Sequence, residues 1–125
     1  MDSFFNRSPG VVSRELLGMT IDVNGQEAVI EQASPKSPKQ NEHWTDRPLF
    51  DSGVEAYVAP YRGTFLTFLR TGPEGRHSCV RLDIVETEKE RVVGPGHVSR
   101  LLGLEAEQVG RVSLQNDIVV VNFDL

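Results

Sequence analysis

The stretch Thr64-Phe65-Leu66-Thr67-Phe68-Leu69-Arg70 decides the expected fold, because apolar side chains occupy both its odd and its even positions. Side chains of a β-strand point in turn to its two faces, so this strand would be apolar on both of them. A strand of this kind needs cover on each side. We therefore predict that it lies in the centre of a sheet.

Further strand patterns surround this segment, and a tight turn joins two of them. Asn24-Gly25 suits a two-residue hairpin turn, in which both positions take positive φ. Thr71-Gly72-Pro73-Glu74-Gly75 is a second turn, placed directly after the central strand. The expected additional strands are residues 19–23, 26–32, 54–59, 78–85 and 117–123.

Two short helices complete the expected fold. Ser8 is placed to cap the first helix, Pro9 suits its first turn, and Gly18 ends it. The second helix is expected at residues 98–102, between two glycines. Helices this few and this short, together with hairpin-forming strands, predict a domain of the α+β class.

Two segments are expected to lack regular structure. Residues 33–48 are rich in proline and polar side chains and are interpreted as a loop, and residues 86–91 are interpreted as a charged connection. Neither segment has the character of a domain linker. We therefore predict that residues 1–125 form a single compact domain, mostly antiparallel β with a few short helices.

The composition is that of an ordinary globular protein. Hydrophobic residues make up 38% of the chain and charged residues 25%, and the net charge is −5. No segment predicts a membrane span or a signal peptide. Cys79 is the only cysteine, so no internal disulfide can form, and a cytoplasmic location is expected.

Two groups of motifs stand near the two ends of the chain. The first is Phe4-Phe5-Asn6-Arg7 with Val12-Ser13-Arg14-Glu15-Leu16-Leu17-Gly18, and the second is Gly94-Pro95-Gly96-His97-Val98 with Leu101-Leu102-Gly103-Leu104. In sequence and in order they resemble motifs of the alkyladenine (3-methyladenine) DNA glycosylase family. The resemblance implies a compact glycosylase-like fold, a flipped-out damaged purine and hydrolysis of its N-glycosidic bond.

The same resemblance implies that the functional positions of the family have changed in this chain. Ala33 stands where the family has the glutamate that activates water, and Pro35 stands where it has a tyrosine that stacks on the base. Ala59 and Leu69 replace a pocket tyrosine and an asparagine that checks the base. Asp83 replaces an arginine that anchors a phosphate.

Other residues in the matching regions are candidates for a relocated site. Each candidate also has a structural interpretation, as a surface charge, a solvated histidine or a packing aromatic. The catalytic candidates are Glu31 and His43, because a carboxylate or an imidazole can serve as general base. The candidates for the base pocket are Tyr57, Trp44 and Tyr61. The candidates for DNA contact are Lys36, Lys39, Arg47 and Arg62.

Metal and cofactor chemistry have little support in the sequence. The three histidines, His43, His77 and His97, lack the spacing of metal ligands, and there is no second cysteine. Gly94-Pro95-Gly96 is too short for a phosphate-binding loop, and its proline lacks an N–H donor. We therefore expect no metal and no cofactor.

Two functions remain open at this point. One is a diverged alkylpurine DNA glycosylase-like protein that recognises damaged purines, or hydrolyses their N-glycosidic bond, in base excision repair. The alternative is a non-catalytic module that binds a small molecule, a protein or a second copy of itself. The net charge of −5 favours the alternative. A pocket flanked by basic side chains, with a carboxylate near its floor, would favour the glycosylase.

Overall fold

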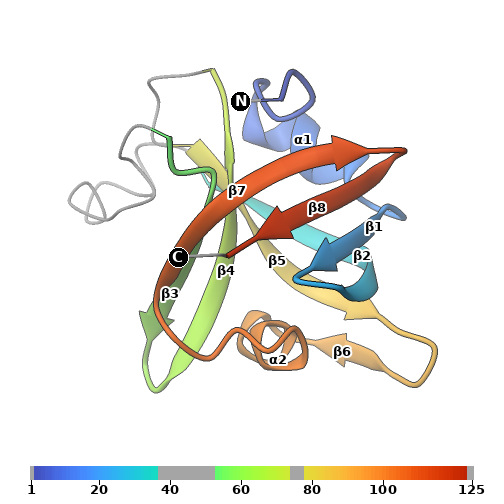
Figure 1. Cartoon of the computed structure of the whole chain (residues 1–125), viewed down its shortest axis with the longest axis vertical. Coiled ribbons are helices and arrows are strands. Elements are labelled where there is room, and N and C mark those ends of the chain that lie inside the picture. Colours follow the sequence, from blue (N-terminus) through green and yellow to red (C-terminus); the bar gives the residue numbers. More distant parts are fainter. Residues whose placement is uncertain (1, 37–52, 74–77, 124–125) are drawn as a thin grey trace.

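The computed structural model describes residues 2–36, 53–73 and 78–123, which form an eight-stranded sheet and two short helices (Figure 1). The helices are α1 (Pro9–Glu15) and α2 (Pro95–Leu101). The strands are β1 (Thr20–Val23), β2 (Gln26–Lys36), β3 (Ala56–Tyr61), β4 (Thr64–Thr71), β5 (Ser78–Glu86), β6 (Arg91–Val93), β7 (Gln108–Gln115) and β8 (Ile118–Asn122). The predicted single α+β domain, mostly strand, is confirmed.

The sheet closes on itself, because β2 pairs with β5 as well as with β1. The strand order is β2-β1-β8-β7-β3-β4-β5-β6, and the additional β2–β5 pairing joins the first strand of this series to the last but one. Within the described residues, every strand except β6 thus has a neighbour on each side. The pairs are antiparallel apart from β1 and β8, which run parallel. The prediction of mostly antiparallel pairing is therefore confirmed.

The main hydrophobic core lies inside the closed sheet, and the two helices pack against it from opposite ends (Figure 1). From α1, Val12 contributes a fully buried side chain, and Val98 does the same from α2. The hydroxyls of Thr67 in β4 and Ser99 in α2 share a buried hydrogen bond of 2.7 Å. This bond satisfies two polar groups that water cannot reach, and so fixes α2 against the sheet.

Strand β4 is covered on both faces, as its sequence predicted. Leu69 belongs to the core inside the sheet, whereas Leu66 and Phe68 belong to a second buried cluster on the other face. The same second cluster includes Tyr57 and Cys79. Cys79 is fully buried, so it packs as a small apolar side chain.

Three segments differ from the sequence prediction. Residues 33–36 belong to β2 and are not part of a loop, because Pro35 is carried in register opposite Val80 of β5. The expected charged connection at residues 86–91 is a tight hairpin between β5 and β6. Strand β7 was missed altogether, since its sequence Gln108–Gln115 lacks a clean alternation of apolar and polar residues.

The helices and the first turn agree with the prediction to within a few residues. Ser8 accepts a hydrogen bond from the N–H of Val11 and so caps α1. Asn24 and Gly25 both take positive φ, of 51° and 92°. The second helix begins earlier than predicted, at Pro95. Neither helix in the described ranges has the length and apolar character needed to cross a membrane.

Candidate functional site

The position to which the resemblance assigns a general base is almost completely buried. Ala33 lies on β2 opposite Leu82 of β5, and only 9% of its surface is exposed. Leu69, at the position of the base-checking asparagine, is fully buried in the same core. Two positions that the resemblance assigns to the reaction are thus filled by packed apolar side chains.

Tyr57, a predicted base-pocket residue, is also unavailable for stacking. Its side chain is fully buried in the second cluster, beside Phe68 and Cys79. Its hydroxyl donates a hydrogen bond to the carboxylate of Glu107. In this structure Tyr57 therefore packs in the interior with its hydroxyl satisfied, and it offers no exposed ring for stacking.

Asp83, at the position of the phosphate-anchoring arginine, forms a small polar network. Arg81 donates from Nε to Oδ1 of Asp83 at 2.6 Å, and the hydroxyl of Ser34 also donates to this carboxylate. Residues two positions apart in a strand share a face, so Arg81 and Asp83 lie side by side on β5 and form an ion pair. The guanidinium charge of Arg81 is therefore largely balanced within the protein.

Tyr61 and Arg62 are brought together at the tip of the β3–β4 hairpin. Tyr61 is 46% exposed, and the guanidinium of Arg62 lies 5.3 Å from the centre of its ring. Arg62 takes positive φ, of 48°, in the turn between the two strands. This tip presents an aromatic ring and a positive charge to solvent, as both predicted roles require.

The remaining basic and aromatic candidates divide into two groups. Lys36 is half-buried at the end of β2, where it pairs in register with Cys79 of β5. The other predicted site residues lie outside the described residues, and they are Lys39, His43, Trp44 and Arg47.

Glu31 lies at an irregularity in the pairing of β2 with β5. The register passes from Ile30 opposite Val85 to Gln32 opposite Ile84, so Glu31 has no partner residue. Bulges of this kind redirect a side chain. Arg91 donates from Nε to Oε1 of Glu31 at 3.2 Å.

Glu31 also acts on the neighbouring carboxylate of Glu86. A hydrogen bond with Glu31 and repulsion between the two negative charges raise the pKa of Glu86 above its ordinary value of 4.5, against the smaller opposing effect of Arg91. A protonated Glu86 can donate to Glu31, whose buried Oε2 has no other donor among the described residues. Sequence analysis missed Glu86 and Arg91, because nothing local in a charged segment reveals the strand opposite it.

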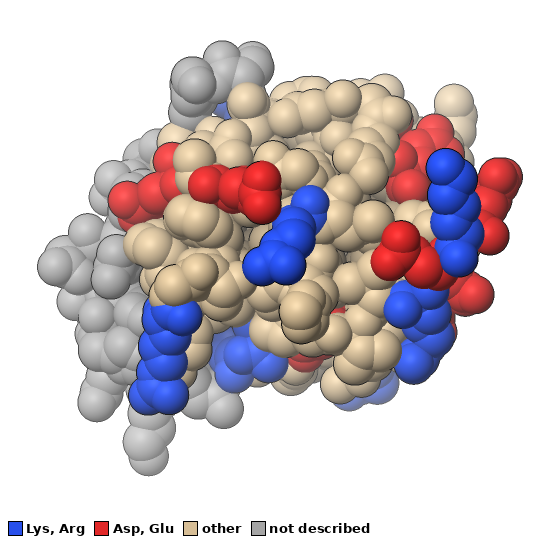
Figure 2. Space-filling view, turned by 90° about the horizontal axis from the view of Figure 1, so that it is seen from below, with Lys and Arg blue, Asp and Glu red and all other residues tan. Residues whose placement is uncertain are grey.

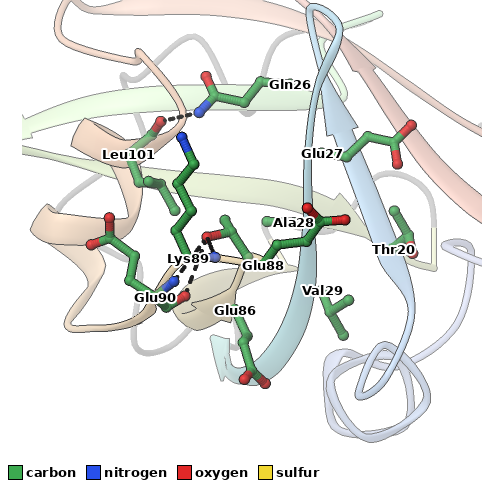
Figure 3. Close-up of a pocket in the computed structure, with 11 residues that line it drawn as sticks. Thr20, Gln26, Glu27, Ala28, Val29, Glu86, Glu88, Lys89, Glu90 and Leu101 are labelled. Atoms are coloured by element: carbon green, nitrogen blue, oxygen red, sulfur yellow. Dashed lines mark hydrogen bonds between the residues drawn. The ribbon is translucent and has the colours of Figure 1, made fainter.

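A broad open groove lies beside this carboxylate pair, between the β1–β2 hairpin and the turn from β5 to β6 (Figure 3). Its volume is about 820 Å³. The Lys89 side chain extends toward Gln26, whose amide donates to the carbonyl of Leu101 at 2.7 Å (Figure 3). Lys89 is the single basic residue of the lining, and the acidic ones are Glu27, Glu86, Glu88 and Glu90.

The electrostatic character of this groove differs from the expectation for a glycosylase. The groove is acidic, whereas a pocket for damaged DNA was expected to be flanked by basic side chains. On the face shown in Figure 2, acidic and basic side chains are intermixed and no continuous basic surface forms. Among the predicted site residues that the structure describes, none lines this groove.

Comparison with models of known protein families found no match to this chain, and comparison with curated proteins found no similar sequence. Over the residues that the structure describes, no group of three or more histidine, cysteine, aspartate or glutamate side chains is arranged to hold a metal ion.

Proposed function

We propose that this chain is a diverged relative of the alkyladenine DNA glycosylases that serves as a binding module and does not excise bases. The observation that carries this proposal is the burial of Ala33 at the position of the family's general base. A methyl group has no lone pair with which to activate water. A positioned general base contributes about 10²–10⁴-fold to a rate, so its loss alone removes most of the activity.

The burial of neighbouring positions supports the same proposal. Leu69 and Tyr57 are fully buried, and Asp83 is tied to Arg81. A flipped base would need space among these side chains, but they belong to close-packed clusters. The positions that the resemblance assigns to base recognition therefore serve stability in this chain.

The proposed glycosylase-like fold is supported by where the resembling motifs fall. Val12 to Gly18 covers most of α1 and the turn after it, directly before the β1–β2 hairpin. Gly94-Pro95-Gly96 leads into α2, where a Cβ on Gly96 would lie only 2.5 Å from Oγ1 of Thr64. Both motifs thus stand at junctions that position a helix against the sheet.

A second candidate function is base excision through a relocated site. It is favoured by the contact of Glu31 with Glu86 and Arg91, because a carboxyl group with a raised pKa, such as that of Glu86, can serve as an acid in a reaction. The exposed Tyr61 and Arg62 would be available to a base and a phosphate. The acidic groove beside the pair speaks against this candidate.

Single-turnover base release separates the two functions. Duplex and single-stranded oligonucleotides carrying hypoxanthine, ethenoadenine or 3-methyladenine are incubated with excess protein, and a gel shift on the same samples at low salt reports binding. We expect no release above the protein-free rate. Release that is lost in both Glu31→Gln and Glu86→Gln, but kept in the exposed control Glu105→Gln, would establish the relocated site instead.

A further inference from the structure

Strand β6 carries backbone groups that its partner β5 does not use. The N–H of Thr87 donates to the carbonyl of Glu90, and the N–H of Gly94 donates to the carbonyl of Asp83, both at 2.8 Å. Val92 lies midway, opposite Val85. Hydrogen-bonded and non-hydrogen-bonded pairs alternate along an antiparallel ladder, so Val92 bonds to β5 through its backbone.

The same alternation turns the backbone of the two flanking residues outward. Arg91 and Val93 occupy the non-hydrogen-bonded pairs, opposite Glu86 and Ile84, so their N–H and C=O groups point away from β5. Among the described residues, no hydrogen bond involves these four groups. Val93 is also 53% exposed, so its side chain is accessible to a partner. An edge of this kind can pair with a further strand.

An open groove of about 370 Å³ is lined by β6 together with α2. Its lining consists of Glu90 to Val93 and of His97, Arg100 and Leu101 from α2. Figure 1 shows β6 at the margin of the sheet with α2 beside it. An edge strand facing a helix provides backbone pairing on one side and side-chain contacts on the other.

The charges of the groove indicate which partner it fits. Its lining contains two guanidinium groups, of Arg91 and Arg100, and one imidazole, of His97, against the single carboxylate of Glu90. Arg91 is held by Glu31. Arg100 is exposed and forms no ion pair with the described residues. An acidic side chain on an added strand would therefore meet a positive charge.

We propose that β6 and the facing side of α2 form a docking groove for an extended acidic segment of another protein, which adds to the sheet beside β6. This inference rests on the proposed binding function and names its partner. Side chains directly opposite one another on paired strands lie on the same face. The segment thus places an apolar residue beside Val93, and an acidic side chain of the segment pairs with Arg100 across the groove.

The probe is a short fluorescent peptide in which valine and glutamate alternate, and its binding to the full chain is measured by fluorescence anisotropy. A matched peptide has lysine in place of glutamate, and another carries N-methyl groups along its backbone. We expect the glutamate peptide alone to bind, because the other two lack the negative charge or the backbone donors. Equal binding of all three peptides, or no binding at all, overturns the proposal.

Variants of the protein locate the site. Val93→Pro removes an N–H that β5 does not use, so the β5–β6 pairing is kept while the docking edge loses a donor. Arg100→Glu reverses the facing charge, and Arg14→Glu makes the same change on exposed α1 as a control. We expect Val93→Pro and Arg100→Glu each to weaken peptide binding about tenfold or more, because each loses a backbone or charged hydrogen bond. The control Arg14→Glu should bind the peptide as the wild type does.

Each outcome can be assigned to one of the two proposals. Binding that persists in both Val93→Pro and Arg100→Glu overturns the β6 groove. A concentration-dependent dimer that Val93→Pro abolishes would also overturn it, by showing that a second copy occupies the edge. Base release from damaged DNA, measured on the same preparation, contradicts only the proposed non-catalytic function. The two failures are therefore distinguishable.

Discussion

At the scale of single residues, the pair of Glu31 and Glu86 makes a pH dependence predictable. Contact with Glu31 raises the pKa of Glu86 above 4.5 in the folded protein. The folded state therefore binds a proton more tightly than the unfolded state. By linkage, this residue makes the free energy of unfolding fall as the pH rises from 4.5 through the raised pKa.

Glu86→Gln is expected to remove this part of the pH dependence. A neutral amide is not repelled by Glu31, so the variant should lose less stability than the wild type between pH 4.5 and neutrality. Urea denaturation across this pH range measures the difference, with Glu88→Gln in the adjoining turn as the control. If the free energy of unfolding falls with pH equally in the wild type and in Glu86→Gln, the two carboxylates do not interact in solution.

At the scale of elements, local patterns predicted most strands but not their lengths or neighbours. The central strand and the Asn24-Gly25 turn were predictable, because apolar alternation and positive φ are properties of a few consecutive residues. The continuation of β2 through Pro35 was not, since it depends on pairing with β5. Strand β7 was not predicted because it contains Gly110, and glycine usually weakens the interior of a strand.

Gly110 has a steric reason to be in β7, and this gives a second prediction. A Cβ at this position would lie 2.2 Å from the carbonyl oxygen of Asn122 and 2.9 Å from the ring of Phe123. Gly110→Ala must therefore displace β8, and we expect a loss of about 1–3 kcal/mol in the free energy of unfolding, as in overpacked cores.

The matched control is the same substitution in α1. A Cβ on Gly10 would meet only the end of the Arg14 side chain, at 3.8 Å. Because alanine favours a helix over glycine, Gly10→Ala should be neutral or stabilising, by at most about 1 kcal/mol. Urea denaturation of both variants checks the pair. If both substitutions change the free energy of unfolding equally, β8 can move away from a Cβ at position 110 at little cost.

At the scale of the whole molecule, closure of the sheet decides which candidate residues can act. The resemblance assigned functional positions to Ala33 and Leu69, and Tyr57 was a candidate for the base pocket. The sequence alone does not show whether such residues are buried or exposed. Pairing of β2 with β5 and of β3 with β4 encloses these residues. The same closure leaves β6 as the one strand without a second neighbour in the described part of the chain, and this too follows only from long-range pairing.

Amide hydrogen exchange tests this architecture directly. Strands of the closed sheet are hydrogen-bonded to a neighbour on both sides, so their central amides should exchange only when a large part of the sheet unfolds. In β6 protection should alternate, with the Val92 amide protected by its bond to β5 and the amides of Arg91 and Val93 exchanging rapidly. Residue-resolved exchange by NMR measures the pattern. Protection of Val93 equal to that of Val92 would mean that the edge is already covered, and would remove the basis for strand addition at β6.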